Sequence, residues 1–138
     1  MHVLICDDDA AFGARMADYI HDYFEARSVQ LQTVVCTGAA EALRTPYLEL
    51  YQLAFLDVDM PGTNGIALGR ELKQRSPDIR LVYVSAYLEF APEGYTVNAY
   101  RYLLKRDIAR MLPKCLDDLL AAFTDQHRTL TVHHNRAT

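Results

Sequence analysis

Four short apolar runs in this chain each end in a polar residue, and this pattern limits both the fold and the chemistry. The runs are Val3–Cys6, Leu53–Leu56, Leu81–Val84 and Tyr100–Leu104, and they lead into Asp7 with Asp8, Asp57, Ser85 and Lys105. Short apolar runs between helical patterns are typical of buried parallel strands. In an open α/β sheet, ligands bind beyond the carboxyl ends of such strands. We therefore expect three carboxylates, one hydroxyl and one ammonium to meet at one edge of a sheet.

The segments between these runs alternate between helical and extended patterns, which favours an α/β fold with a mostly parallel sheet. We expect helices over residues 10–27, 38–45, 66–75 and 88–98, a further strand over 29–36 and a loop over 60–65. The helix over 88–98 is the weakest, because it holds Pro92 and Gly94. Asp9 is expected to cap the first helix or act in its first turn, and Thr37 is expected to cap the second.

The C-terminal part of the chain is expected to begin with one more helix, which contains Pro113. Either this helix kinks at Pro113, or a short turn precedes it and Pro113 occupies its first turn. Residues 1–124 are expected to form one domain. Residues 125–138 are interpreted as a linker that enters an incomplete strand at Thr129–Val132, with a frayed tail as the alternative.

Length and composition exclude several classes of protein. A chain of 138 residues with a net charge of −4 suits one domain and argues against broad binding to a phosphate backbone. No run reaches the ~18 apolar residues of a membrane span, and the N-terminus lacks the features of a signal peptide. Cys6, Cys36 and Cys115 are expected to be reduced core residues of a cytoplasmic protein.

The expected cluster suits phosphoryl transfer. Three neighbouring acids cannot all stay ionised without a cation, and Mg²⁺ prefers oxygen ligands in a wet site. Asp57 is the candidate nucleophile, since a carboxylate attacks phosphorus to give an acyl phosphate. Lys105 can neutralise charge on the phosphoryl oxygens, and Ser85 can donate a hydrogen bond to one of them. Each residue is a weak signal alone, but the joint pattern at four strand ends is specific.

Several segments together resemble the receiver domain of two-component response regulators, over about residues 2–123. These are Leu4-Ile5-Cys6-Asp7-Asp8-Asp9, Leu56-Asp57-Val58-Asp59-Met60-Pro61-Gly62 with Asn64-Gly65, Val84-Ser85-Ala86 and Tyr102-Leu103-Leu104-Lys105. The resemblance implies a flavodoxin-like, doubly wound five-stranded parallel sheet with strand order 2-1-3-4-5.

The resemblance also assigns roles to individual residues. Asp57 would be the phosphoacceptor, and Ser85 and Lys105 would contact the phosphoryl group. Asp8 would bind Mg²⁺ directly, Asp7 largely through water, and Asp57 and the main-chain carbonyl of Asp59 would complete the protein ligands. Tyr102 would turn inward when Ser85 moves toward the phosphate.

Four positions depart from the family pattern, and the mildest departure is Ser85, where the family more often has threonine. Arg106 replaces the usual proline after the lysine, which puts the family's cis peptide in doubt because a non-proline cis bond costs about 3 kcal/mol. Asp59 and Tyr87 occupy positions that tune dephosphorylation in the family, and here an effect of unknown sign is expected.

Residues 89–105 resemble receivers attached to LytTR-type DNA-binding domains. The function implied is that of a bacterial switch that takes a phosphoryl group from a histidine kinase and controls transcription. Its expected partners are that kinase, a second copy when phosphorylated, and DNA only through an effector domain outside this chain; no membrane partner is expected. Enzyme activity would be limited to self-phosphorylation from small donors and auto-dephosphorylation.

Three alternatives remain at this point. The first is a stand-alone phosphorelay receiver that acts through protein contacts. The second is a phosphatase of the haloacid dehalogenase type, with Asp57 as nucleophile and Asp59 as general acid, although Pro61 stands where that motif has Thr or Val. The third is a degenerate receiver, but every residue of the acidic pocket is present.

Overall fold

The computed structural model describes residues 1–87 and 98–137, with the backbone alone at 63 and 126–137. It divides into two compact units, Met1–Arg106 and Asp107–Thr138, which are described separately. The predicted domain boundary after residue 124 lies inside the second unit and stays a prediction.

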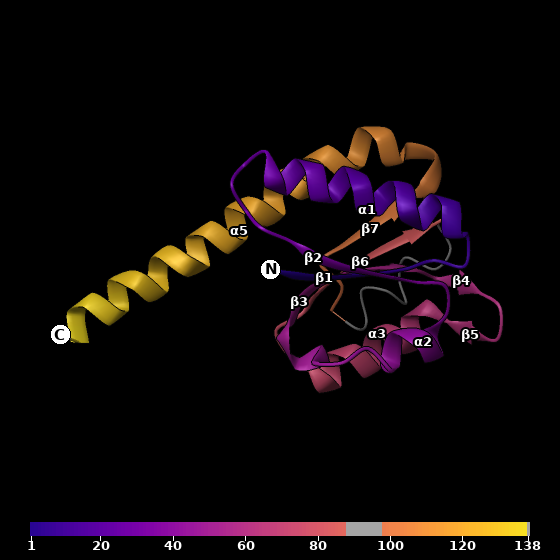
Figure 1. Cartoon of the computed structure of the whole chain (residues 1–138), viewed down its shortest axis with the longest axis horizontal. Coiled ribbons are helices and arrows are strands. Elements are labelled where there is room, and N and C mark those ends of the chain that lie inside the picture. The colour runs from indigo at the N-terminus through magenta and orange to yellow at the C-terminus, as the bar shows by residue number, and fades with distance from the viewer. Residues whose placement is uncertain (88–97, 138) are drawn as a thin grey trace. The chain divides into compact units, whose positions relative to one another are not determined.

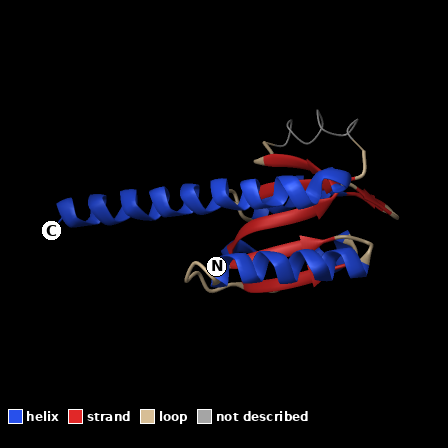
Figure 2. Cartoon of the chain, turned by 90° about the horizontal axis from the view of Figure 1, so that it is seen from above, coloured by secondary structure: helices blue, strands red, loops and turns tan. Residues whose placement is uncertain are grey.

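The first unit is built on one parallel sheet (Figure 2). Its strands are β1 (His2–Cys6), β2 (Gln32–Cys36), β3 (Tyr51–Asp57), β6 (Arg80–Ser85) and β7 (Arg101–Leu104). They lie in the order β2-β1-β3-β6-β7, all parallel, which confirms the predicted order 2-1-3-4-5. The central strands are buried almost throughout, as expected for a sheet covered on both faces.

Helices cover the two faces of this sheet. Helix α1 (Ala10–Glu25) lies on one face, and α2 (Ala39–Leu43) and α3 (Gly65–Arg75) lie on the other (Figure 1). A short 3-10 helix, η1 (Leu48–Leu50), precedes β3. The predicted doubly wound architecture is therefore confirmed for this unit.

A side-chain cap marks the start of α1 but not that of α2. Asp9 caps α1 as predicted, because its Oδ1 accepts the N–H of Phe12 at 3.1 Å. The prediction of Thr37 as the cap of α2 was wrong by one residue, since Gly38 occupies that position. Thr37 instead donates its N–H and its hydroxyl to Glu41 Oε2, both at 3.3 Å. The threonine therefore contacts the first turn of the helix through Glu41 but caps none of its N–H groups.

The segment predicted as a loop over 60–65 contains a small antiparallel pair, β4 (Asp59–Met60) and β5 (Thr63–Asn64). Pro61 and Gly62 form the turn between the strands, and Gly62 has a φ of +79°. Proline fixes φ at the first turn position, and glycine accepts the positive φ at the second. The Pro-Gly signal therefore marked a hairpin turn. The helix predicted over 88–98 falls mostly on residues 88–97, outside the described residues.

The second unit is dominated by α5 (Ile108–Ala137), which follows the 3-10 turn η3 (Lys105–Asp107). A short turn does precede the helix, as one of the two alternatives predicted. Pro113 lies further inside the helix than its first turn, so that part of the alternative was wrong. Its ring nitrogen cannot donate to the carbonyl of Ala109. The strand predicted at Thr129–Val132 was also wrong, because α5 continues through it. A helix satisfies its own backbone hydrogen bonds, whereas a strand needs a partner strand.

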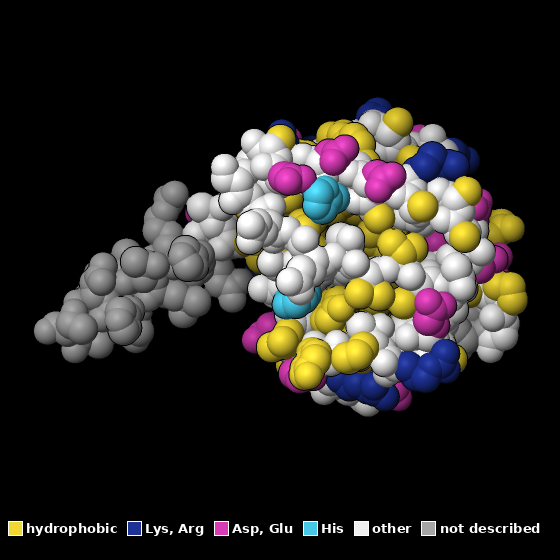
Figure 3. Space-filling model, in the orientation of Figure 1, with side chains coloured by type: hydrophobic (Ala, Val, Ile, Leu, Met, Phe, Trp, Pro, Cys, Tyr) yellow, Lys and Arg dark blue, Asp and Glu magenta, His cyan; other side chains and the backbone are white. Residues whose placement is uncertain are grey.

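The three cysteines are buried, which confirms the prediction that they are core residues. Burial raises the pKa of the Cys6 thiol to about 12, so this thiol is unreactive near neutral pH. Among the described residues, no helix combines the length and the apolar character needed to cross a membrane. Acidic, basic and hydrophobic side chains are interspersed on the visible face in Figure 3, in keeping with the small net charge.

Candidate functional site

Strand register brings the predicted residues to one edge of the sheet. Cys6 pairs with Leu56 across β1 and β3, so Asp7 and Asp57, one residue further along, leave neighbouring strands at the same level. Asp57 also pairs with Val84 of β6, and Ser85 is the next residue. Lys105 directly follows β7. The convergence predicted from four strand ends is thus a property of the parallel register.

The carboxylates of Asp7, Asp8 and Asp57 form a compact cluster, in which one oxygen from each lies within 4.8 Å of the others. Asp7 and Asp57 are buried, whereas Asp8 is exposed to water. Two fixed oxygen donors and one solvent-facing donor fit a hard cation that keeps several waters. The donor set therefore fits Mg²⁺. Asp59 is exposed and stays outside this cluster, with its N–H 3.4 Å from Asp57 Oδ1.

Lys105 lies across two of these acids. Its Nζ is 2.9 Å from Asp7 Oδ2 and 3.5 Å from Asp57 Oδ2. Burial lowers the pKa of the Lys105 ammonium, but its hydrogen bond to Asp7 and the charge of Asp57 outweigh burial, so the net shift is upward. One cation is thus shared by two buried carboxylates.

Asp57 remains hard to ionise despite this lysine. Burial raises the pKa of its carboxyl to about 7, the Asp8 and Asp7 carboxyls add to the rise, and Lys105 opposes it. A second positive charge in the cluster would favour the carboxylate form, which is the nucleophilic form. The electrostatics therefore match a site that a divalent cation completes.

Ser85 and Tyr102 are joined through the backbone of Tyr87. The Tyr87 N–H donates to Ser85 Oγ at 3.0 Å, and the Tyr102 hydroxyl donates to the Tyr87 carbonyl at 2.6 Å. Ser85 is fully buried, and Tyr102 is also buried. Sequence reasoning identified the two ends of this connection but missed that Tyr87 acts through its main chain. No side-chain pattern carries that information.

Phe12 is a second residue whose place sequence reasoning missed. Its ring centroid lies 4.6 Å from Lys105 Nζ. Its spacing in α1 indicated only a core-facing position, because helical periodicity does not show which strand end a side chain will meet.

The peptide bond between Lys105 and Arg106 is trans, since the described residues contain no cis bond. This answers the question that the missing proline raised.

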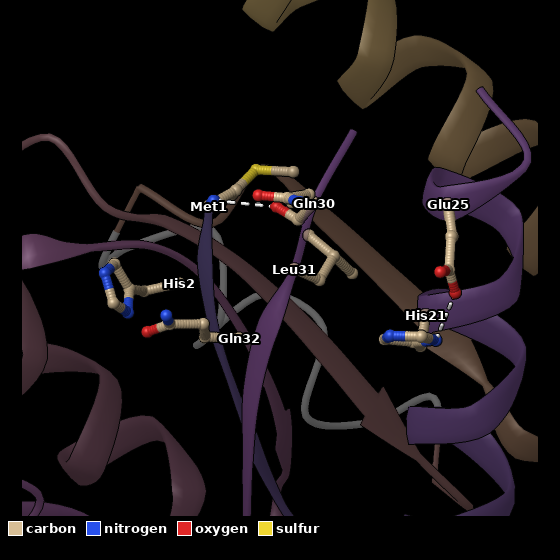
Figure 4. Close-up of a pocket in the computed structure, with 7 residues that line it drawn as sticks. All are labelled: Met1, His2, His21, Glu25, Gln30, Leu31 and Gln32. Atoms are coloured by element: carbon tan, nitrogen blue, oxygen red, sulfur yellow. Dashed lines mark hydrogen bonds and ion pairs between the residues drawn. The ribbon is translucent and has the colours of Figure 1, made fainter. Parts of the chain in front are cut away.

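A separate cavity of about 400 Å³ lies at the other end of the strands (Figure 4). It is lined by Met1, His2, His21, Glu25, Gln30, Leu31 and Gln32. There His21 Nδ1 lies 3.2 Å from Glu25 Oε2 and 3.6 Å from Asp22 Oδ1. The two carboxylates are largely exposed, and the cavity lies at the starts of β1 and β2, away from the acidic cluster.

Two relatives show what this chain is similar to. It is 33% identical over 125 residues to an uncharacterized response regulatory protein of Shewanella oneidensis, covering 89% of this chain and 50% of that protein. It is 29% identical over 105 residues to the sensory transduction protein LytT of Enterococcus faecalis, covering 76% of this chain and 42% of LytT. The chain spans about half the length of the curated relatives it matches.

Solved structures show the same fold. The response regulatory domain of mrkE from Klebsiella pneumoniae superposes with a TM-score of 0.74 at 21% identity, covering 91% of this chain and 99% of that one. The response regulator TrrA from Thermotoga maritima, solved with Mg²⁺-BeF, superposes with a TM-score of 0.64 at 20% identity. The match covers 86% of this chain and 97% of that one.

The family model described as response regulator receiver domain matches residues 3–116, which include the acidic cluster and, except for His2, all five strands of the parallel sheet. This chain therefore belongs to the response regulator receiver family, as a phosphoaspartate receiver of a two-component system.

Proposed function

We propose that Asp57 is the residue that accepts the phosphoryl group, from the phosphohistidine of a histidine kinase. A carboxylate oxygen of Asp57 forms the new bond to phosphorus as the bond from phosphorus to the imidazole nitrogen breaks, and the released imidazole takes up a proton. The observation that carries this assignment is that Lys105 reaches both Asp57 and Asp7 from the fifth strand of the sheet. That arrangement places a cation where phosphoryl charge would arrive.

Asp7, Asp8, Asp57 and the main-chain carbonyl of Asp59 would hold Mg²⁺. When bound, the ion supplies positive charge that offsets the acids and the phosphoryl oxygens. The compact cluster of Asp7, Asp8 and Asp57 supports this assignment, as does the binding of Mg²⁺-BeF by TrrA. Ser85 would donate its hydroxyl proton to a phosphoryl oxygen while still accepting from Tyr87.

The output is proposed to run from Ser85 to Tyr102 and to control transcription. Movement of Ser85 toward the phosphoryl group would pull on the Tyr87 backbone, to which Tyr102 is also bonded. Similarity to LytT and the half-length match to the relatives support an effector domain of the LytTR type in the whole protein. In the phosphorylated state the receiver would form a homodimer. A stand-alone phosphorelay receiver remains the alternative. The length of the full gene distinguishes the two, because only the transcriptional regulator needs an additional effector domain.

Mass measurement of the intact protein tests the assignment. Phosphoramidate with Mg²⁺ should add one phosphoryl group to the wild type and none to Asp57→Asn. Equal labelling of the two proteins would show that another residue is the acceptor. Asp59→Asn is the matched control, because it removes a nearby carboxylate and should keep labelling. A generic phosphomonoester should not be turned over, in contrast to the behaviour of a phosphatase.

A further inference from the structure

A closed series of contacts links the ammonium of Lys105 to Asp7 and to the first residues of α1. Asp7 Oδ1 accepts the N–H of Asp9 at 2.9 Å, and Asp9 Oδ1 accepts the N–H of Phe12 at 3.1 Å. The ring of Phe12 lies 4.6 Å from Lys105 Nζ, and that nitrogen returns to Asp7 Oδ2 at 2.9 Å. The N-terminal turn of α1 is thereby tied to both the acid and the lysine of the site.

The ring supplies a different kind of attraction from the two carboxylates. An aromatic face attracts a cation through its quadrupole, at separations up to about 6 Å from the centroid. This attraction spreads over the ring face, so it does not tie the ammonium to one oxygen. A lysine that must transfer from carboxylates to phosphoryl oxygens can keep the ring contact while it moves.

Lysine has a long, flexible stem and a strongly hydrated head, so it leaves a site easily for water. The Lys105 side chain is 24% exposed, whereas those of Asp7 and Asp57 are 4% exposed. A route to solvent therefore exists on the side of the lysine. Phe12 is half-buried beside that lysine.

We infer that Phe12 is a positioning residue that holds the Lys105 ammonium in the site through its ring face. This inference rests on the proposed function for its consequence, a faster gain of the phosphoryl group, but not for the contact itself. The backbone of Phe12 is fixed by the Asp9 cap, so its ring is presented by a rigid helix end.

A double-mutant cycle with Phe12→Leu and Lys105→Met tests the contact without phosphorylation. Leucine keeps apolar bulk but lacks a quadrupole. If the pair interacts, each single change should include the loss of the contact, and the double variant should lose it only once. The fold-change in the unfolding equilibrium constant of the double variant should then be about 2- to 5-fold smaller than the product of the fold-changes of the two single variants. A fold-change in the double variant equal to the product of the two single fold-changes would overturn the inference.

The rate of labelling by phosphoramidate with Mg²⁺ tests the consequence. Phe12→Leu should slow it about 2- to 5-fold, and Phe12→Tyr, which keeps the ring, should restore it. In the Lys105→Met background, Phe12→Leu should have no further effect. Tyr19→Leu is the matched control, because Tyr19 lies two turns along α1 and is 45% exposed; its rate should equal that of the wild type.

The outcomes separate the two proposals. A protein that shows the coupling in unfolding but takes no phosphoryl group would contradict the proposed function and leave the Phe12 contact standing. A protein that is labelled normally, with equal rates for Phe12→Leu and the wild type, would contradict the positioning role. Slow labelling of both Phe12→Leu and Phe12→Tyr would also contradict it, because the effect would then not follow the aromatic face.

Discussion

The hydroxyl of Tyr102 donates a 2.6 Å hydrogen bond to the main-chain carbonyl of Tyr87, whose own N–H is bonded to Ser85. The tyrosine is 8% exposed and therefore already lies inward. A single peptide segment thus links the buried serine at the site to an aromatic side chain on the last strand.

Removal of the Tyr102 hydroxyl should uncouple the two ends of this link. Tyr102→Phe keeps the ring and loses the bond, so the free energy of unfolding in urea should fall by about 1 kcal/mol. Labelling of Asp57 should persist, while self-association induced by beryllofluoride, measured by sedimentation, should weaken. Tyr19→Phe is the control and should change neither quantity. Unaltered association of Tyr102→Phe would argue against Tyr102 as part of the switch.

Stability without metal should depend on pH through Asp57. Its carboxyl has a pKa of about 7 in the folded chain against an ordinary value of 3.8, so between these values the native state binds the extra proton. The free energy of unfolding should therefore contain a contribution that is lost as pH rises from about 4 to 7. In EDTA, Asp57→Asn should be more stable than the wild type by about 1–3 kcal/mol at pH 8, and the gap should narrow at pH 5. A gap of constant size would contradict the raised pKa.

Addition of Mg²⁺ should raise the melting temperature of the wild type, because ligand that binds only the native state adds RT ln(1 + [L]/Kd) to its stability. Asp8→Asn should be neutral or stabilising without metal, since it removes one like charge, and should lose the Mg²⁺ response. Thermal melts with and without about 10 mM Mg²⁺ measure the response of the wild type and of Asp8→Asn. This concentration is well above the dissociation constant expected of a wet, open site. A full response in Asp8→Asn would remove Asp8 from the ligand set.

Loss of the Lys105 charge should be costly, because two buried carboxylates then face each other without a cation. Lys105→Met should lower the free energy of unfolding at pH 8 by about 1–3 kcal/mol, less than for a fully buried pair since the lysine is partly exposed. The variant should recover part of this loss at pH 5, where Asp57 holds a proton. Urea titrations at the two pH values provide the comparison, and an equal loss at both would show that packing of the lysine stem dominates.

A methyl group at Gly65 should disturb Asp57 directly. A Cβ at this position would overlap the carbonyl oxygen of Asp57 and lie 2.8 Å from its carbonyl carbon. Gly65→Ala should therefore cost about 1–3 kcal/mol and reduce labelling by phosphoramidate. Gly38→Ala is the matched control, because nothing lies within 4 Å of a Cβ there. Near-equal stabilities of the two variants in urea would contradict the close packing of Gly65 on Asp57.

The sheet and the acidic cluster were predictable because buried strands require apolar runs in the sequence, and because parallel register brings the residues that follow these runs to one edge of the sheet. The apolar runs gave the strands to within a few residues, and the polar residues that follow them gave Asp7, Asp57, Ser85 and Lys105. The hairpin at Pro61-Gly62 was missed because two-residue strands carry too few positions for a period.

Other features depend on contacts that no local pattern encodes. The ring of Phe12 meets Lys105 across 93 positions of sequence, from Phe12 to Lys105. The alternating run at Thr129–Val132 was read as a strand because period alone cannot separate the two structures in so short a segment. A helix already under way decides the conformation there.

The parallel register has a consequence for folding as well as for chemistry. Asp7, Asp57, Ser85 and Lys105 lie at the ends of four different strands, so loss of β1, β3, β6 or β7 from the sheet would separate one of these residues from the others. Pairings between segments far apart in the sequence form slowly, because the entropy of loop closure must be lost before they form. The chain must therefore be synthesised beyond residue 105 before Lys105 can lie between Asp7 and Asp57.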